Sequence, residues 1–337
     1  MKYIVCEKPH QFELKEKPMP VRKDGEVLLK IRKIGVCGTD IHAFGGTQPY
    51  FEYPRILGHE LAAEYIEGEA KGYKPGDKVT FIPYFHCGEC VACRNGLTNC
   101  CAKITVFGVH IDGGMAEYIT IPEQYLLHGE GLDYDQLALV EPLAIAAHGV
   151  RRAAVNSNDT VLVMGAGPIG IGLIQFAKIA GAKVIALDIN EYRLRFCKEE
   201  LNADATINPA IEDVTARLME ITNGDMPTVV IDATGNRNVM NSAFNYIAHG
   251  GRFVLVGLQK GELSFSHPDF HKRESTLMSS RNATKDDFQY VIECLKNGKI
   301  DPKKYITHRA PFTEMITEFE KWIDPKNNVI KALIELD

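Results

Sequence analysis

The sequence predicts an α/β protein built from two domains, one β-rich and one with a doubly wound parallel sheet. Three observations carry this prediction. The chain has 337 residues, which exceeds the roughly 100 to 200 residues of a single domain. Its first third shows short strand patterns separated by turn residues. From about Asp159 the pattern changes to strand, glycine turn and helix.

The strands of the first part run from Lys2 to about Ile121. Gly, Pro and Asp residues separate them, which is typical of a compact β-barrel-like domain. The predicted strands are YIVCE, FELKE, EVLLKIRKIGVCG, ELAAEYIEGE and GDKVTFIPY.

The second part alternates apolar strands with helices. Strands that are apolar almost throughout indicate a parallel sheet covered on both faces. The predicted elements are TVLVMGAGPIG, IGLIQFAKIAGA, KVIALD, EYRLRFCKEEL, PTVVIDATG, NVMNSAFNYIAHGG and RFVLVGL.

A single predicted helix, DQLALVEPLAIAAHGVRRAA, joins the two parts, with Pro142 near its start. After about Lys285, the helical patterns DDFQYVIECLKNGK and PFTEMITEFEKWI and the strand KALIEL return to the first domain. We therefore predict a first domain over residues 1–147, a second over residues 148–285, and a return to the first over residues 286–337.

Charge and composition exclude several classes of partner. The net charge of -6 comes without a cluster of Lys and Arg, so no nucleic acid is expected. No run of about 18 apolar residues occurs, so no membrane span is expected and the protein is predicted to be cytoplasmic. A small molecule is the expected partner. In a reducing compartment, the nine cysteines would remain thiols, and a local cluster of them would hold metal rather than form disulfides.

The densest cysteine cluster is CGECVACRNGLTNCC. Cys87, Cys90 and Cys93 are three residues apart, and the chain then returns with Cys100 and Cys101. Four thiolates at this spacing predict a tetrahedral zinc site, which is structural because no position is left for a substrate. The alternatives are an iron site or thiols without metal. Spacing alone leaves open whether Cys100 or Cys101 is the fourth ligand.

The segment GAGPIG predicts a dinucleotide site. It follows the strand TVLVM and opens a helix, with Gly165, Gly167 and Gly170 at the glycine positions and Pro168 and Ile169 between them. The first glycine makes the turn, the second lets the backbone approach a pyrophosphate, and the third packs helix on strand. The pyrophosphate would lie at the helix N-terminus.

Asp188 ends the next predicted strand, eighteen residues after Gly170. A carboxylate there accepts hydrogen bonds from ribose hydroxyls and repels a 2'-phosphate, so NAD is predicted rather than NADP. Arg193 and Arg195 keep NADP as an alternative. Asp188 could also cap the helix that begins near Glu191.

A second metal site is predicted from residues outside the cysteine cluster. Cys37 in GVCGTDIH and His59 in ILGHE, with either Glu60 or Glu141, would leave one coordination position open, as a catalytic zinc requires. Each residue also has a structural interpretation, such as a core cysteine, a hydrogen-bonded histidine or an acid near a helix N-terminus. Their combination with a dinucleotide site favours catalysis.

These motifs resemble the zinc-containing medium-chain dehydrogenases over essentially the whole chain. The resemblance depends on GVCGTDIH, GHE, the four-cysteine spacing, KPGDKV, EPLAIAAH and GAGPIG. It implies a GroES-like β-rich catalytic domain with a doubly wound Rossmann domain inserted and an active site in the cleft between them. It also implies a homodimer or homotetramer built through the Rossmann domains.

The resemblance further implies that Cys37 and His59 bind the catalytic zinc and that Cys101 is the fourth ligand of the structural zinc. Alcohol dehydrogenases of the family have a cysteine where this chain has Glu141. This departure indicates the polyol and threonine dehydrogenase branch, in which Glu60 ligates and Glu141 acts through water. The two carboxylates can exchange.

By the same resemblance, Thr39 and His42 match the proton relay of the family. The sugar-acid members of the branch are the most similar, which implies an acidic substrate. His110 and Arg281 are candidate cationic partners for it, with a surface ion pair or a cofactor contact as the alternative for Arg281.

The predicted function is therefore zinc-dependent hydride transfer from a secondary alcohol, L-galactonate or a related aldonate, to NAD. The first alternative is a sorbitol-type polyol or L-threonine 3-dehydrogenase. A non-catalytic dinucleotide-sensing protein is the alternative from another class, but it has no need for Cys37, His59 and a carboxylate together. A zinc-independent reductase would lack the four-cysteine loop.

Overall fold

The computed structural model describes residues 1–48 and 51–337. It divides the chain into two compact units. Unit 1 comprises Met1–Glu141 and Thr284–Asp337, and unit 2 comprises Pro142–Ala283. The chain therefore leaves unit 1 once and returns to it, so that the C-terminal segment belongs with the N-terminal one.

Unit 1 is built on a seven-stranded sheet in the order β16-β17-β3-β4-β5-β9, with β8 paired to β3. Two further pairs, β1-β2 and β6-β7, lie outside it. The strands are β1 (Lys2–Lys8), β2 (Gln11–Glu16), β3 (Glu26–Gly35), β4 (Glu60–Glu67), β5 (Lys78–Phe81), β6 (Tyr84–Phe85), β7 (Thr105–Val106), β8 (Tyr118–Pro122), β9 (Leu126–His128), β16 (Ile306–Pro311) and β17 (Lys331–Glu335). The helices are α1 (Gly38–Phe44), α2 (Val91–Arg94), α3 (Tyr134–Ala138), α10 (Lys285–Lys296) and α11 (Met315–Trp322).

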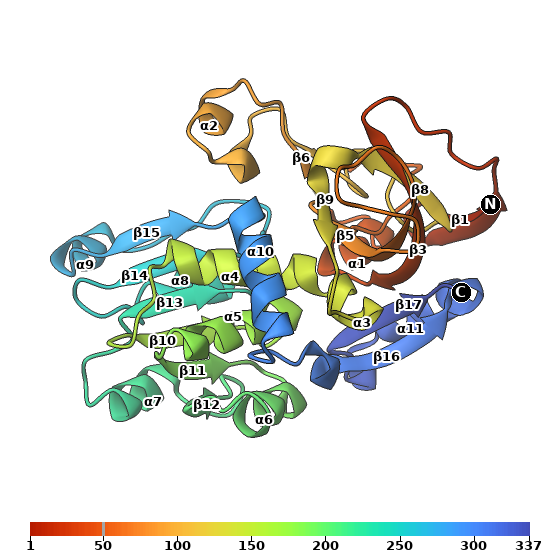
Figure 1. Ribbon diagram of the computed structural model, residues 1–337. Coiled ribbons are helices and arrows are strands. Elements are labelled where there is room, and N and C mark those ends of the chain that lie inside the picture. The colour runs from red at the N-terminus through yellow and green to blue at the C-terminus, as the bar shows by residue number, and fades with distance from the viewer. Residues whose placement is uncertain (49–50) are drawn as a thin grey trace. The chain divides into compact units, whose positions relative to one another are not determined.

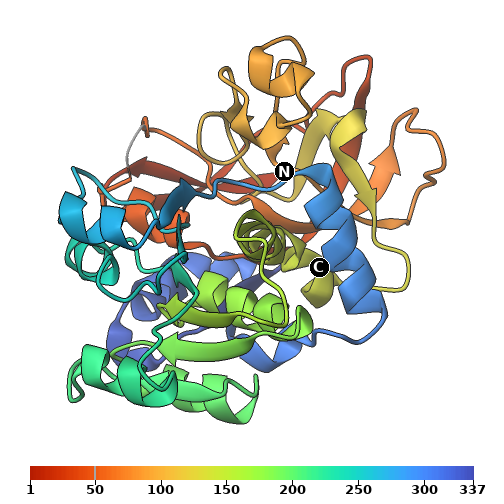
Figure 2. The same ribbon diagram turned by 90° about the vertical axis from the view of Figure 1, so that its left-hand side faces the viewer.

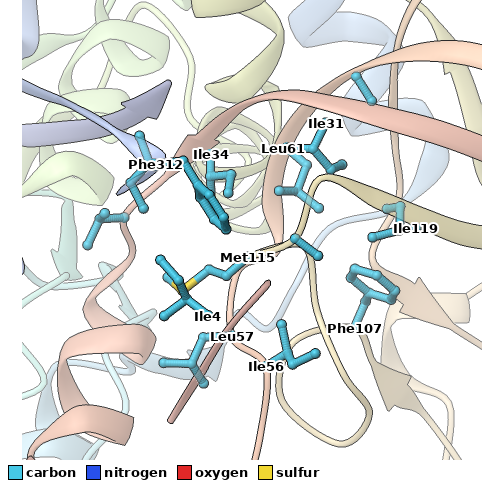
Figure 3. Close-up of a cluster of buried hydrophobic side chains, with 14 of the residues drawn as sticks. Ile4, Ile31, Ile34, Ile56, Leu57, Leu61, Phe107, Met115, Ile119 and Phe312 are labelled. Carbon is cyan, nitrogen blue, oxygen red and sulfur yellow. The ribbon is translucent and has the colours of Figure 1, made fainter. Parts of the chain in front are cut away.

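The core of unit 1 gathers apolar side chains from distant parts of the chain. Figure 3 shows Ile31 and Ile34 of β3, Leu61 of β4 and Phe312 around Met115. All five are buried. This core fixes β3, which ends two residues before Cys37, and β4, which begins at Glu60.

Strand β3 lies at the centre of the sheet. It pairs with β17 on one side and β4 on the other, so that Gly35 faces Leu333 and Glu60 in register. This order brings the last strand of the chain within two strands of Glu60.

The four-cysteine segment projects from the rest of unit 1. Figures 1 and 2 show the short helix α2 standing away from the sheet strands. The pair β6-β7 closes the base of this segment, with Tyr84 opposite Val106 and Phe85 opposite Thr105. No residue of α2 is buried, so apolar packing does not hold this segment.

Unit 2 is a six-stranded parallel sheet in the order β12-β11-β10-β13-β14-β15, which is that of a dinucleotide-binding doubly wound fold. Helices lie above and below its strands in Figure 2. The strands are β10 (Thr160–Met164), β11 (Lys183–Leu187), β12 (Ala205–Ile207), β13 (Val229–Asp232), β14 (Arg252–Leu255) and β15 (Thr276–Ser279). The helices are α5 (Pro168–Ile179), α6 (Glu191–Glu199), α7 (Val214–Ile221), α8 (Arg237–Ala243) and α9 (His267–Lys272).

The predicted joining helix is wrong in one respect, because it is two helices. Helix α3 ends at Ala138, Leu139 adopts φ -102° and ψ 1°, and α4 runs over Val140–Arg152. The ring of Pro142 would collide with the carbonyl of Ala138 in a continuous helix, which explains the break. The break at Leu139 places Glu141 in the first turn of α4.

Candidate functional site

Three candidate ligands from the ends of two segments meet in unit 1. One ligand atom from each of Cys37, His59 and Glu60 lies within 4.8 Å of the others. Cys37 is the N-cap of α1, His59 immediately precedes β4, and Glu60 is the first residue of that strand. His59 and Glu60 are buried and Cys37 is partly buried. The sequence motifs GVCGTDIH and GHE therefore come together in space.

Asp40 fixes the two segments to each other. Its carboxylate accepts the backbone N–H of Cys37 at 2.9 Å and that of Gly58 at 3.4 Å. The residue is fully buried, and burial is the main cause that raises its pKa. Its backbone contacts on both sides of the cluster make it a positioning residue for Cys37 and His59.

The imidazole of His59 is surrounded by acidic groups. Burial alone would lower its pKa, but Cys37, Asp40 and Glu141 outweigh burial and raise it well above the usual value. Its Nδ1 atom lies 4.0 Å from an oxygen of Asp40 and has no hydrogen-bond partner. The surroundings of His59 therefore favour a cation.

Glu60 has an unexpected partner. The ammonium of Lys331, at the start of β17, donates to Glu60 Oε2 and also to the carbonyl of Val36 at 2.9 Å. Both side chains of this ion pair are buried. A Cβ atom at Gly35 would collide with Glu60 Oε2, so only glycine at the end of β3 lets the carboxylate cross that strand.

Glu141 lies in the first turn of α4 and is 2% exposed. Its Oε1 accepts the hydroxyl of Tyr84, whereas its buried Oε2 has no hydrogen-bond partner. Burial, with a smaller contribution from Glu60, raises the pKa of Glu141 to about 7 against the opposing effects of His59 and Tyr84. Glu141 lies outside the group of ligand atoms that are within 4.8 Å of one another.

These residues fit a zinc ion. The donor set of sulfur, imidazole nitrogen and carboxylate oxygen is that of catalytic zinc sites with one open position. Buried polar atoms without a partner are costly, and both His59 Nδ1 and Glu141 Oε2 are such atoms. A nearby divalent cation would offset the acidic charge around His59.

The four-cysteine cluster has the dimensions of a zinc–thiolate site. Sulfur–sulfur distances are 3.4 Å for Cys90 to Cys93, 3.5 Å for Cys101 to Cys87 and 4.0 Å for Cys87 to Cys93. A tetrahedron with zinc–sulfur bonds of about 2.3 Å has edges of about 3.8 Å. Cys101 is buried in the cluster, and Cys100 is exposed outside it.

Two cysteines of the cluster have pKa shifts in opposite directions. Backbone N–H groups of Cys93 and Ala102 lower the pKa of Cys90 to about 6. Desolvation and, to a lesser extent, the hydrogen bond with the Cys90 side chain raise the pKa of Cys93 to about 12. Neighbouring thiolates repel each other, so all four ionise together only around a cation.

The glycine loop of unit 2 has the form of a pyrophosphate cradle. Gly165 has φ +94°, and a Cβ atom at Gly170 would collide with the carbonyl of Gly165. Gly167 is the N-cap of α5, and a Cβ atom there would meet nothing within 4 Å. Pro168 is the first helical residue and Ile169 follows it. The open space beside Gly167 fits a pyrophosphate at the helix N-terminus.

Asp188 directly follows β11 beside this loop. Its carboxylate accepts the N–H of Ala166 at 2.6 Å and that of Asn190 at 2.8 Å. The interpretation of Asp188 as the helix cap is wrong, because Asn190 is the N-cap of α6 and accepts the N–H of Arg193 at 3.2 Å. Asn190 lies two residues after Asp188 and directly before the first residue of α6, so its side chain is the one that reaches the free N–H groups.

The remaining predicted residues are not gathered into these clusters. Thr39 and His42 lie on α1, where the exposed His42 pairs through Nδ1 with Thr47 Oγ1 at 2.9 Å. His110 is exposed, and its Nδ1 accepts the N–H of Val106 at 2.9 Å. Arg281 is exposed after β15 in unit 2.

Three functional residues were missed by the sequence analysis. Asp40 lies inside the motif GVCGTDIH, where an acid at the third helical position signals a capping box. Lys331 opens the strand KALIE directly before the apolar residues ALI, and a charge beside such a run is a signal for a buried partner. Tyr84 carries no such signal.

Two families match the chain in the order of its two units. The alcohol dehydrogenase GroES-like domain matches residues 23–130, and the zinc-binding dehydrogenase domain matches residues 168–297. The L-galactonate-5-dehydrogenase of Escherichia coli K12 is 45% identical over 99% of this chain and 98% of its own length. The chain belongs to the zinc-binding dehydrogenase family.

Other members of this family are also similar over nearly the whole chain. The sorbitol dehydrogenase of Halalkalibacterium halodurans is 31% identical over 90% of both chains. A crystal structure of an alcohol dehydrogenase, RspB from Escherichia coli CFT073, complexed with the cofactor NADH, is 32% identical and has a TM-score of 0.93. The structural match covers 100% of this chain and 99% of the RspB chain.

Family membership confirms the predicted fold class, a GroES-like domain with a Rossmann-type domain, and the prediction of a zinc-dependent dehydrogenase. By their names, two of these relatives act on a sugar acid and on a polyol, as L-galactonate-5-dehydrogenase and sorbitol dehydrogenase. Within the described residues, no helix has both the length and the apolar character needed to cross a membrane.

Proposed function

We propose that this dehydrogenase oxidises a secondary alcohol of a sugar acid, L-galactonate or a related aldonate, with NAD as the hydride acceptor. The observation that carries the chemistry is the buried group of Cys37, His59 and Glu60, whose ligand atoms lie within 4.8 Å of one another. The substrate class is supported by the 45% identity to the L-galactonate-5-dehydrogenase of Escherichia coli.

Cys37, His59 and one carboxylate, from Glu60 or Glu141, hold the catalytic zinc in this proposal. Zinc supplies a Lewis acid that lowers the pKa of a substrate hydroxyl toward neutral pH. Asp40 keeps the first two ligands in place through its backbone hydrogen bonds. The burial of His59 and Glu60 keeps bulk water from competing at the metal.

The proton of the substrate hydroxyl leaves through α1. Thr39 and His42 lie three residues apart on this helix, so they lie on the same side of it. Thr39 accepts the proton of the substrate hydroxyl as its own hydroxyl proton moves on to the exposed imidazole of His42, which releases a proton to solvent.

The glycine loop and Asp188 bind the cofactor in this proposal. The N–H groups at the start of α5 bind the pyrophosphate beside Gly167, and Asp188 binds the ribose hydroxyls of the adenosine. The carboxylate repels a 2'-phosphate, which favours NAD over NADP. Arg193 lies in the first turn of α6 beside this position. NAD supplies the hydride acceptor.

An acidic substrate requires a cationic partner. The exposed side chains of His110 and Arg281 are the proposed partners of the substrate carboxylate. A guanidinium binds a carboxylate with two parallel hydrogen bonds, so Arg281 would give the stronger contact.

The edge of the parallel sheet supports assembly into a homodimer. Among the described residues, β15 pairs only with β14 and ends the strand order of the sheet. Its Leu277 side chain is 39% exposed, and that of Leu258, which follows β14, is 68% exposed. A second copy of the chain could pair with this edge, which would extend the sheet and cover the apolar side chains.

The proposal is tested by measuring NAD reduction by the zinc-loaded protein with five substrates. They are L-galactonate, L-idonate, sorbitol, L-threonine and a simple secondary alcohol. We expect the aldonates to give the highest kcat/KM. A higher kcat/KM for sorbitol or L-threonine would replace the aldonate by that substrate class. If none of the alcohols reduces NAD or NADP, the proposed function is wrong.

A further inference from the structure

We infer that Tyr84 is a positioning residue that orients the Glu141 carboxylate in the metal site, and that the four-cysteine loop holds Tyr84 in place. The inference deepens the proposed function, since it takes the group around Cys37 and His59 to hold zinc. It assigns to the structural loop a role in the catalytic site.

The contact itself is specific and buried. The hydroxyl of Tyr84 donates to Glu141 Oε1, and Tyr84 is 4% exposed and Glu141 2% exposed. The ring of Tyr84 packs edge-on against Phe288 with centroids 6.1 Å apart. The ring is therefore held by packing while its hydroxyl is aimed at one oxygen of the carboxylate.

The hydrogen bond makes the two oxygens of Glu141 unequal. Oε1 is occupied by Tyr84, whereas Oε2 is buried and without a hydrogen-bond partner. A carboxylate held by one oxygen cannot rotate freely, so the other oxygen is presented in a fixed direction. That oxygen is then ready to bind the metal or a water on it.

The other candidate carboxylate is held differently. Glu60 is paired with the ammonium of Lys331, whereas Glu141 is paired with a neutral phenol. The ammonium of Lys331 competes with a metal for the negative charge of Glu60, whereas the neutral phenol of Tyr84 leaves the charge of Glu141 to a metal. Tyr84 therefore favours participation of Glu141 when zinc is bound.

Tyr84 lies at the base of the four-cysteine loop. Phe107 N–H donates to the carbonyl of Pro83 at 2.9 Å, and the β6-β7 pair continues this ladder with Tyr84 opposite Val106. Three residues after Tyr84, the N–H of Cys87 donates to the sulfur of Cys101 at 3.3 Å. A metal in the loop would clamp the outer end of the two strands.

The β6-β7 pair is too short to be stable on its own. Each of the strands β6 and β7 has only two residues, and an isolated hairpin is marginally stable. The thiolate site would therefore supply the constraint that keeps β6 and its tyrosine in place. Loss of the metal from the four-cysteine loop should therefore loosen β6 and Tyr84, and so disturb the orientation of the Glu141 carboxylate.

The test is a Co²⁺ titration of the metal-free full-length protein. A site with one thiolate and a site with four thiolates give different sulfur-to-cobalt absorption, so the two affinities are read separately. We expect Tyr84→Phe to weaken Co²⁺ binding at the one-thiolate site by about 10- to 100-fold and to alter its spectrum. Phenylalanine keeps the ring that packs on Phe288, so folding is preserved.

Tyr125→Phe is the matched control. Tyr125 is also 4% exposed, and its hydroxyl accepts the N–H of His86 at 2.9 Å without touching either candidate carboxylate. The Tyr125→Phe variant should bind Co²⁺ at the one-thiolate site with the affinity of the wild type. Unchanged affinity and spectrum in Tyr84→Phe, or an equal loss in Tyr125→Phe, would overturn the role of Tyr84.

A double-variant cycle tests the role of the loop. Cys90→Ser should weaken the one-thiolate site in the wild-type background, but much less when Tyr84 is already phenylalanine. Additive losses would show that the loop does not act through Tyr84. These measurements need no turnover, so a protein that oxidises no alcohol but shows these affinities would refute the proposed function alone.

Discussion

Lys331 forms a buried ion pair with Glu60 across the central strand of the unit 1 sheet. The two residues are 271 positions apart in the chain and lie on β17 and β4, with Gly35 of β3 between them. The exposed fraction is 0% for the Lys331 side chain and 1% for that of Glu60. One candidate zinc ligand is therefore already neutralised by the protein itself.

Removing Lys331 should destabilise the metal-free protein. Lys331→Met leaves the Glu60 carboxylate buried without its cation, at a cost of about 3 to 5 kcal/mol in the free energy of unfolding of unit 1. Zinc can replace the lost cation, so the zinc-loaded variant should lose less. Thermal unfolding with and without zinc measures both values.

Lys33→Met is the control for this change. Lys33 pairs with Glu335 in the same sheet, but both side chains are partly exposed, at 21% and 36%. Its loss should cost less than about 1 kcal/mol, with or without zinc. Equal effects of the two lysine variants would show that the buried pair has no special role.

Gly167→Ala should weaken cofactor binding without harming the fold. Gly167 has φ -74° and space for a methyl group, so the free energy of unfolding should change by no more than about 0.5 kcal/mol. The methyl group would project where the pyrophosphate lies, and the Kd for NADH should rise at least about tenfold. Fluorescence titration with NADH measures it.

Gly170→Ala is the comparison for Gly167→Ala, because it should lower stability. A methyl group there collides with the carbonyl of Gly165, which should cost about 1 to 3 kcal/mol of stability. If Gly167→Ala binds NADH as tightly as the wild type, the cofactor does not lie against this loop as proposed.

Asp188→Ser should shift the cofactor preference toward NADP. The carboxylate that repels a 2'-phosphate is then lost, and the ratio of kcat/KM for NADP to that for NAD should rise by about tenfold or more. Asp204→Ser is the control, because Asp204 accepts the N–H of Val184 at 2.7 Å near the opposite end of β11. A preference unchanged in Asp188→Ser would argue against the ribose contact.

Cys90→Ser should abolish the structural metal site. In zinc-saturated buffer, the zinc content should fall from about two to about one per chain, and the thermal midpoint should fall because the loop has no apolar core of its own. Cys100→Ser, which changes the exposed neighbour, should do neither. Loss of zinc in Cys100→Ser instead would mean that the fourth ligand is misassigned. Elemental analysis after gel filtration gives the zinc content.

The features that the sequence predicted are those encoded locally. The four-cysteine loop and the glycine motif each lie within fifteen residues, so their spacing already specifies the geometry that a metal or a pyrophosphate needs. Cys37 and His59, with either Glu60 or Glu141, were predicted because their three ligand types occur together with a dinucleotide site in one chain. The structure gathers Cys37, His59 and Glu60 within 4.8 Å.

The features that the sequence did not predict depend on contacts between distant residues. Tyr84 meets Glu141 across 57 positions, and Lys331 meets Glu60 across 271. Such pairs follow from the strand order, which no local pattern specifies. The strands β12 and β15 were missed for another reason, since they have three and four residues and lie at the two edges of the sheet.

The central claim is that Cys37, His59 and a carboxylate hold the metal on which alcohol oxidation depends. It is tested most directly by measuring zinc content and the rate of NADH formation from L-galactonate in the wild type and in Cys37→Ser. We predict that the variant loses one zinc per chain, keeps the four-thiolate site, and slows by at least about a hundredfold. A Cys37→Ser protein that retains its full rate would contradict the account.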